Sequence, residues 1–381
     1  MDTTPAQKSE IIGLFFLLIL LLQNSFRELL IGKTKSQTPS NSKERSQAID
    51  ILRGLAMCGI VLIHVDSYIL YYHPEDSITI FSRAVANISR FSVPTFILSS
   101  GIFLSWKGKK EFWKARLIHL ILPYSIFCMG GYFTKYPPTD GWSSDFIIRY
   151  FSGSIFEPYY YVPLLLQFYF FYSIFFKENH LWSSNLRYGI LFSALILNLA
   201  SNHFFPEGEN LKRIEPFLFS NFIFFFVLGI FTGPILSSPL LYSDFFNQRK
   251  IKISLYVLTG IYILYIIFTT IQTRFGFSNH FIFYPIVSFL ILLNLGIKLE
   301  KSNNRAIKIF NQILSHIGKN SLFIFLAHPI LIHILHAFDP FSLGGKYISY
   351  FIILVLNISI PLGIGELYKK ISSLIIARTG Q

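Results

Sequence analysis

The chain has 381 residues, of which 52% are hydrophobic and only 14% charged, against roughly 25% charged in soluble proteins. This composition excludes an ordinary soluble enzyme and predicts an all-α, polytopic integral membrane protein. The formal net charge is +13, but the basic residues are spread through short segments between apolar runs, so no nucleic-acid partner is expected. Cys58 and Cys128 lie within apolar runs and match no metal-binding spacing, so no metal site is expected.

Residues 1–45 differ from the rest of the chain. The apolar run from Ile11 to Leu22 is shorter than the roughly 20 residues that a spanning helix needs. We therefore expect an interfacial helix, with a true additional span over residues 11–31 as the alternative. The polar stretch from Lys33 to Arg45 predicts a flexible linker.

Residues 46–370 form the predicted membrane domain, followed by a cytoplasmic tail over residues 371–381. Most Lys and Arg residues fall on one side of the predicted spans, and the positive-inside rule makes that side cytoplasmic. Both ends of the domain are then expected on the cytoplasmic side. The domain itself is expected in the cell membrane. The apolar runs predict about ten transmembrane helices, at 49–72, 86–106, 117–135, 159–176, 188–205, 217–236, 253–272, 280–297, 320–337 and 347–368.

The first predicted span carries Arg53 and His64 eleven positions apart. Eleven residues make about three helical turns, so both side chains share one face, about 16 Å apart along the axis. Ionisable groups at membrane depth are costly and indicate a functional site. The charge distribution puts Arg53 near the cytoplasmic side and His64 toward the outer side.

Further ionisable and polar groups follow on later spans. Arg90 begins the second span at its outer end. The densest positive cluster, Lys107 to His119, contains Lys114, and it places Arg116 and His119 one turn apart at a cytoplasmic helix end, a pattern that suits phosphate groups. The alternative is a simple topology signal and lipid contact.

Candidates for contacts with a second substrate are Arg90 on the second predicted span and residues on the fourth and ninth. Tyr160, Tyr161 and Gln167 occur on the fourth span, where they could hydrogen-bond a sugar or act only as interfacial aromatics. His328 lies in the middle of the ninth span, ahead of a proline.

Four segments occur in a fixed order along the chain: Arg53-x10-His64, Phe91-Ser-Val-Pro94 with Ser100-Gly101, Arg116-Leu-Ile-His119, and Ser321 to His328. Together they resemble the membrane acyltransferase-3 family over roughly residues 46–368. The Tyr160 region resembles the exopolysaccharide-modifying members more than the lipopolysaccharide-modifying branch. One departure is His119, where the family often has a second arginine.

The resemblance implies transfer of an acyl group, acetyl or succinyl, from cytoplasmic acyl-CoA to a hydroxyl of an extracytoplasmic glycan. It assigns His64 as the catalytic histidine and Arg53 to both catalysis and the donor site. It assigns Arg116 to phosphate contacts, with Lys114 and His119 beside it. Neutral His64 would act as general base or carry the acyl group transiently. Two alternatives stay open: a transporter or flippase for a glycan or lipid-linked sugar, and an N-acyltransferase for amino sugars.

Overall fold

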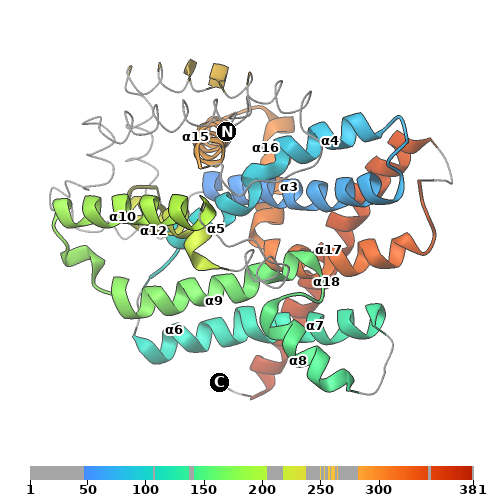
Figure 1. Ribbon diagram of the computed structural model, residues 1–381, viewed down its shortest axis with the longest axis horizontal. Helices are drawn as coiled ribbons and strands as arrows, with labels where there is room; N and C mark the ends of the chain where they lie inside the picture. Colours follow the sequence, from blue (N-terminus) through green and yellow to red (C-terminus); the bar gives the residue numbers. More distant parts are fainter. Residues whose placement is uncertain are drawn as a thin grey trace.

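A computed structural model describes residues 47–105, 108–136, 141–203, 218–236, 282–341 and 345–379, with scattered residues between 249 and 264. The described residues form helices and turns, with no strand among them (Figure 1). The helices are α3 (Gln47–Tyr72), α4 (Thr79–Ile88), α5 (Ser92–Ile102), α6 (Lys109–Arg116), α7 (Leu122–Lys135), α8 (Trp142–Ser152), α9 (Tyr161–Phe171), α10 (Ser184–His203), α12 (Ile223–Leu236), α15 (Phe283–Glu300), α16 (Arg305–Lys319), α17 (Ser321–His336) and α18 (Lys346–Thr379).

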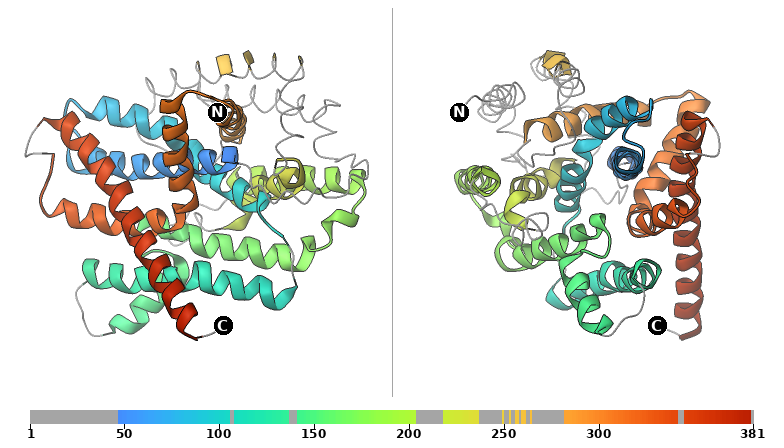
Figure 2. Two further views of the ribbon diagram at one scale, coloured as in Figure 1. Left: turned by 180° about the vertical axis from the view of Figure 1, so that it is seen from behind. Right: turned by 45° about the vertical axis from the view of Figure 1, so that its right-hand side comes forward.

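Helix α3 is the centre of the arrangement. It contacts α4, α5, α15, α16, α17 and α18, and Figure 2 shows it end-on with neighbours around it. Its 26 residues give a length of about 39 Å, enough to cross a bilayer core of about 30 Å. Because α3 is unbroken from Gln47 to Tyr72, the expected common face of Arg53 and His64 is preserved.

The second predicted span, 86–106, is not one continuous helix. It consists of the end of α4, a 3₁₀ turn at Ser89–Phe91 and then α5. Pro94 lies in the first turn of α5, where a proline costs no helical hydrogen bond. The 11 residues of α5 extend only about 16 Å, too short to cross the membrane alone. Helix α5 packs closely on α12, with Gly229 against the Leu98 carbonyl.

Helix α16 occupies a region that the sequence analysis treats as a cytoplasmic loop between the spans ending at 297 and beginning at 320. The Asn304 side chain caps its first turn by accepting from the Ala306 N–H at 2.9 Å. The helix packs closely on α3, with Gly54 against the Leu314 backbone and Gly318 against the Asp50 backbone. The loop prediction was wrong because α16 is amphipathic and therefore fails a search for uniformly apolar segments.

Among the residues that the structure describes, four helical segments are long and apolar enough to cross a membrane: Gln47–Tyr72, Lys109–Lys135, Glu157–Phe176 and Lys346–Ile371. The pair α16 and α17, bent by 78°, adds a fifth if it forms one broken span. These helices are typical of an integral membrane protein. The number of ten spans stays a prediction. The 1–45 segment and most of the 253–272 span lie outside the described residues, and α18 continues through the predicted tail as far as Thr379.

Candidate functional site

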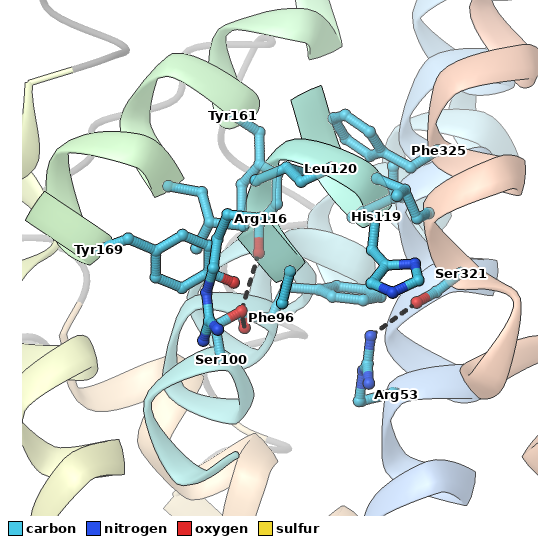
Figure 3. Close-up of a pocket in the computed structure, with 14 residues that line it drawn as sticks. Arg53, Phe96, Ser100, Arg116, His119, Leu120, Tyr161, Tyr169, Ser321 and Phe325 are labelled. Carbon is cyan, nitrogen blue, oxygen red and sulfur yellow. Dashed lines mark hydrogen bonds between the residues drawn. The ribbon is translucent and has the colours of Figure 1, made fainter. Parts of the chain in front are cut away.

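A pocket of about 330 Å³ lies where α3, α5, α6, α9 and α17 approach one another (Figure 3). It brings together four of the residues predicted from the sequence, Arg53 on α3, Arg116 and His119 on α6 and the turn that follows it, and Tyr161 on α9. Their side chains share the pocket with hydroxyls and aromatic rings. The lining residues are Arg53, Ile60, Phe96, Ser100, Ala115, Arg116, His119, Leu120, Tyr161, Leu165, Tyr169, Ser321, Leu322 and Phe325.

Arg53 is held on one wall of the pocket. Its Nη2 donates to the Ser321 hydroxyl at 2.9 Å, and its guanidinium lies 5.8 and 5.7 Å from the ring centroids of Phe96 and Phe103. Ser321 is the first residue of α17, so the positive end of that helix dipole meets Arg53 at the pocket. Both features favour an anion there.

Arg116 and His119 come from the opposite wall, where α6 passes into a π-helical turn at Leu117–Ile121. Arg116 donates to the Phe112 carbonyl at 3.2 Å, and its guanidinium lies over the rings of Phe112 and Tyr169, 3.8 and 4.9 Å from their centroids. A π turn changes the angular spacing of side chains and often occurs at functional sites. Lys114, on the same segment, is exposed and does not line the pocket.

Hydroxyls and aromatic rings close the far end of the pocket. The Tyr161 hydroxyl lies 3.3 Å from the Ser100 hydroxyl. The Tyr161 ring packs on Phe325, with centroids 5.2 Å apart, and Phe325 in turn lies 6.1 Å from His328. The Phe325 ring therefore lies between the pocket and the buried His328.

His64 and His328 form a pair beyond that ring. Their ring centroids are 5.3 Å apart with a 43° angle between the planes, although the residues are separated by most of the domain in sequence. His64 lies one turn past Ile60, which lines the pocket. His328 is fully buried. The predicted catalytic histidine thus lies outside the pocket wall, at the end of the chain of contacts that leads from it.

Arg90 and Tyr160 lie close to this histidine pair. The Arg90 guanidinium is within range of electrostatic interaction with both His64 and Tyr160. Gln167 differs from them, because its Nε2 lies 3.4 Å from the Pro163 carbonyl of its own helix and it lines no part of the pocket. The structure therefore groups Arg90 and Tyr160 with His64 and leaves Gln167 apart.

Sequence reasoning named no role for Ser100, Ser321 or Phe325, although all three line the pocket. Ser100 and Ser321 were noted only as parts of longer motifs, and nothing in a single sequence separates such serines from packing serines. Their meaning depends on the hydroxyl and guanidinium groups that other helices bring to them.

This arrangement offers two chemically different regions. The pocket has two guanidiniums, an imidazole and a helix N-terminus, which together suit a multiply charged anion such as a phosphate group. The region beyond Phe325 has two imidazoles within an apolar setting, which suit proton transfer. Helix α3 joins the two regions.

Comparisons with known proteins place the chain in a family. The acyltransferase-3 family model, described as an acyltransferase domain, matches residues 46–364. Proteins named as probable poly-β-1,6-N-acetyl-D-glucosamine export protein are similar: the one from Staphylococcus aureus strain MW2 is 22% identical over 342 residues, covering 84% of this chain and 91% of that protein. The one from strain MRSA252 is 23% identical over 341 residues, with the same coverage.

No solved structure matches this chain. The family match covers most of the chain, including both regions of the site. With its apolar spanning helices, the chain is a membrane acyltransferase and belongs to the acyltransferase-3 family.

Proposed function

We propose that this enzyme transfers an acyl group from cytoplasmic acyl-CoA to a hydroxyl of an extracytoplasmic polysaccharide, with His64 as the catalytic base. The observation that carries the proposal is the placing of a cationic pocket and a histidine pair along one face of α3. Acyl-CoA has charged phosphates at one end, which would bind in the cationic pocket, and a reactive thioester at the other end, which would lie near the histidine pair.

The donor half of the proposal is supported by the pocket. Arg53, Arg116 and His119 are the basic side chains of its lining, and Ser321 adds the N-terminus of α17. They would bind the phosphates of CoA, and exposed Lys114 would add only long-range attraction. The pantetheine arm would then follow α3 over the roughly 16 Å from Arg53 to His64.

The acyl-transfer step needs a base at the thioester. His64 would take the proton of the acceptor hydroxyl while the hydroxyl oxygen attacks the thioester carbonyl. The carbon–sulfur bond breaks, the ester carbon–oxygen bond forms, and the proton on His64 passes to the departing thiolate to give free CoA. Arg90, near His64, would stabilise the negative charge that develops on the carbonyl oxygen.

The acceptor half is supported by the names of the relatives, which refer to poly-β-1,6-N-acetyl-D-glucosamine. Tyr160 and Tyr161 at the histidine end of the site offer hydroxyls for sugar contacts, whereas Gln167 is turned to its own helix. Because the same names refer to export, polysaccharide transport is the second candidate. Acyl-group consumption distinguishes the two.

The experiment uses the purified protein in liposomes with radiolabelled acetyl-CoA and an oligosaccharide acceptor. We expect label in the oligosaccharide with the wild type, and at least about 100-fold slower transfer with His64→Ala. The matched control is His333→Ala, since His333 is also a histidine within an apolar helix and lies against Phe156. Full transfer by His64→Ala would refute the catalytic role, and oligosaccharide movement without consumption of acetyl-CoA would support transport instead.

A further inference from the structure

His328 has no role in the acyl-transfer step described above, although it lies beside His64. It is fully buried on α17 and is followed by Pro329 inside the helix. Proline has no N–H, so the helical bond to the carbonyl of residue 325 is missing. The imidazole of His328 lies against this part of the backbone, with Nδ1 2.9 Å from the Ile324 carbonyl.

This contact fixes the tautomer of His328. A backbone carbonyl only accepts hydrogen bonds, so Nδ1 must carry the proton. In the neutral ring, Nε2 then carries the lone pair and can only accept. This Nε2 is buried and has no hydrogen-bond partner among the residues that the structure describes. A buried acceptor without a partner costs free energy, so a donor group that can reach Nε2 would be stabilising there.

The group beside this acceptor is the His64 ring, 5.3 Å away between centroids. We infer that His328 is a positioning residue for His64, whose ring N–H it accepts at Nε2, directly after a small ring rotation or through one water. The inference rests on the proposed function, since it concerns the base of that reaction. Catalytic hydrogen bonds are often long before substrate binds.

The positioning has a chemical consequence. When one ring nitrogen of His64 donates to His328, the other nitrogen is left with its lone pair toward the acceptor hydroxyl. After His64 takes the hydroxyl proton, the cation that forms is stabilised by the same hydrogen bond, and the proton then leaves with the thiolate. His328 keeps its Nδ1 proton throughout. The arrangement follows the logic of a catalytic triad, with a neutral imidazole as the orienting group.

The test compares two substitutions of His328 in the full-length protein. His328→Phe keeps a ring of similar shape without the acceptor, and His328→Gln restores an acceptor oxygen near the position of Nε2. For His328→Phe we expect kcat to fall about 100-fold with the KM for acetyl-CoA unchanged. For His328→Gln we expect kcat within about tenfold of wild type. His333→Phe is the matched control on the same helix.

The outcomes separate the inference from the function it depends on. A wild-type kcat for His328→Phe, alongside an inactive His64→Ala, would overturn the role of His328 and leave the proposed function intact. Equal loss in His328→Phe and His328→Gln, with a raised KM for acetyl-CoA, would also overturn it, because the effect would then be structural. Full activity of His64→Ala would refute the catalytic role of His64 on which this inference depends, and absence of acyl transfer by the wild type would refute the proposed function itself.

Discussion

The close contact between α3 and α16 predicts a large effect from adding a single methyl group. A Cβ on Gly54 would lie 2.1 Å from the Leu314 carbonyl oxygen, and a Cβ on Gly318 would lie 2.0 Å from the Asp50 carbonyl oxygen. Both obstacles are backbone atoms, which cannot move aside as a flexible side chain can. Gly54→Ala or Gly318→Ala therefore has to push the two helices apart.

The required displacement follows from these distances. A carbon and a carbonyl oxygen approach to about 3.3 Å, so either substitution needs roughly 1 Å of separation. Overpacking of this kind costs about 1–3 kcal/mol. Arg53 immediately precedes Gly54 on α3, and its 2.9 Å bond to Ser321 would lengthen beyond the usual hydrogen-bond limit. The pocket would then lose the position of one of its arginines, and the protein would lose stability as well.

Two measurements on the detergent-solubilised protein test this reasoning. We expect Gly54→Ala to lower the midpoint of thermal unfolding and to raise the KM for acetyl-CoA. The double variant with Gly318→Ala should cost less than the sum of the single variants, because one separation relieves both contacts. The control is Gly130→Ala in α7, where the new Cβ meets nothing within 4 Å; it should stabilise the helix slightly.

The reasoning would be refuted by a Gly54→Ala protein with the wild-type unfolding midpoint and wild-type KM. Such a result would mean that α16 does not pack on α3 in the way described. A lowered midpoint with unchanged KM would keep the packing and refute the link from Gly54 to the donor pocket.

Two further predictions concern single side chains. Arg116→Lys should raise the KM for acetyl-CoA by tenfold or more in steady-state kinetics, because a lysine cannot keep the planar stacking on Phe112 and Tyr169; a wild-type KM would contradict this. Tyr159→Phe should lower the free energy of unfolding by about 1 kcal/mol in denaturant titration, since its buried hydroxyl donates to the Leu326 carbonyl at 2.6 Å, and an unchanged value would show that this bond contributes nothing.

The parts of the fold that could be predicted are those set by hydropathy alone. The first span was expected at 49–72 and is found at Gln47–Tyr72, and the fourth was expected at 159–176 and is found at Glu157–Phe176. Uniformly apolar segments bounded by polar residues carry this signal. Hydropathy did not predict the break at Ser89–Phe91 or the amphipathic helix α16. Both depend on which other helices pack against a short helix or against the apolar face of an amphipathic one.

The site shows the same division. The common face of Arg53 and His64 follows from helical periodicity, and it is present because α3 is continuous. The pairing of His64 with His328 could not be read from the sequence, since it depends on how α17 lies against α3. Equally, no periodicity indicates that Gln167 and Lys114 lie away from the pocket.

The break between α16 and α17 explains how the pocket obtains part of its attraction for anions. Asn320, which is buried, lies at the 78° bend and donates from its side chain to the His316 carbonyl at 3.0 Å, while its backbone N–H points to the carbonyls that end α16. Lys369 in turn donates to the Asn320 side chain. The end of α16 is thus satisfied locally, as an apolar environment requires.

With the end of α16 satisfied in this way, α17 can begin inside the protein at Ser321, facing Arg53. In a continuous helix through residue 320, the backbone N–H groups of the first turn of α17 would bond to carbonyls of the preceding turn. No helix N-terminus would then face the pocket. The bend is therefore better understood as a part of the pocket than as a packing irregularity. It also accounts for the otherwise unusual burial of an asparagine and a serine in succession within an apolar stretch.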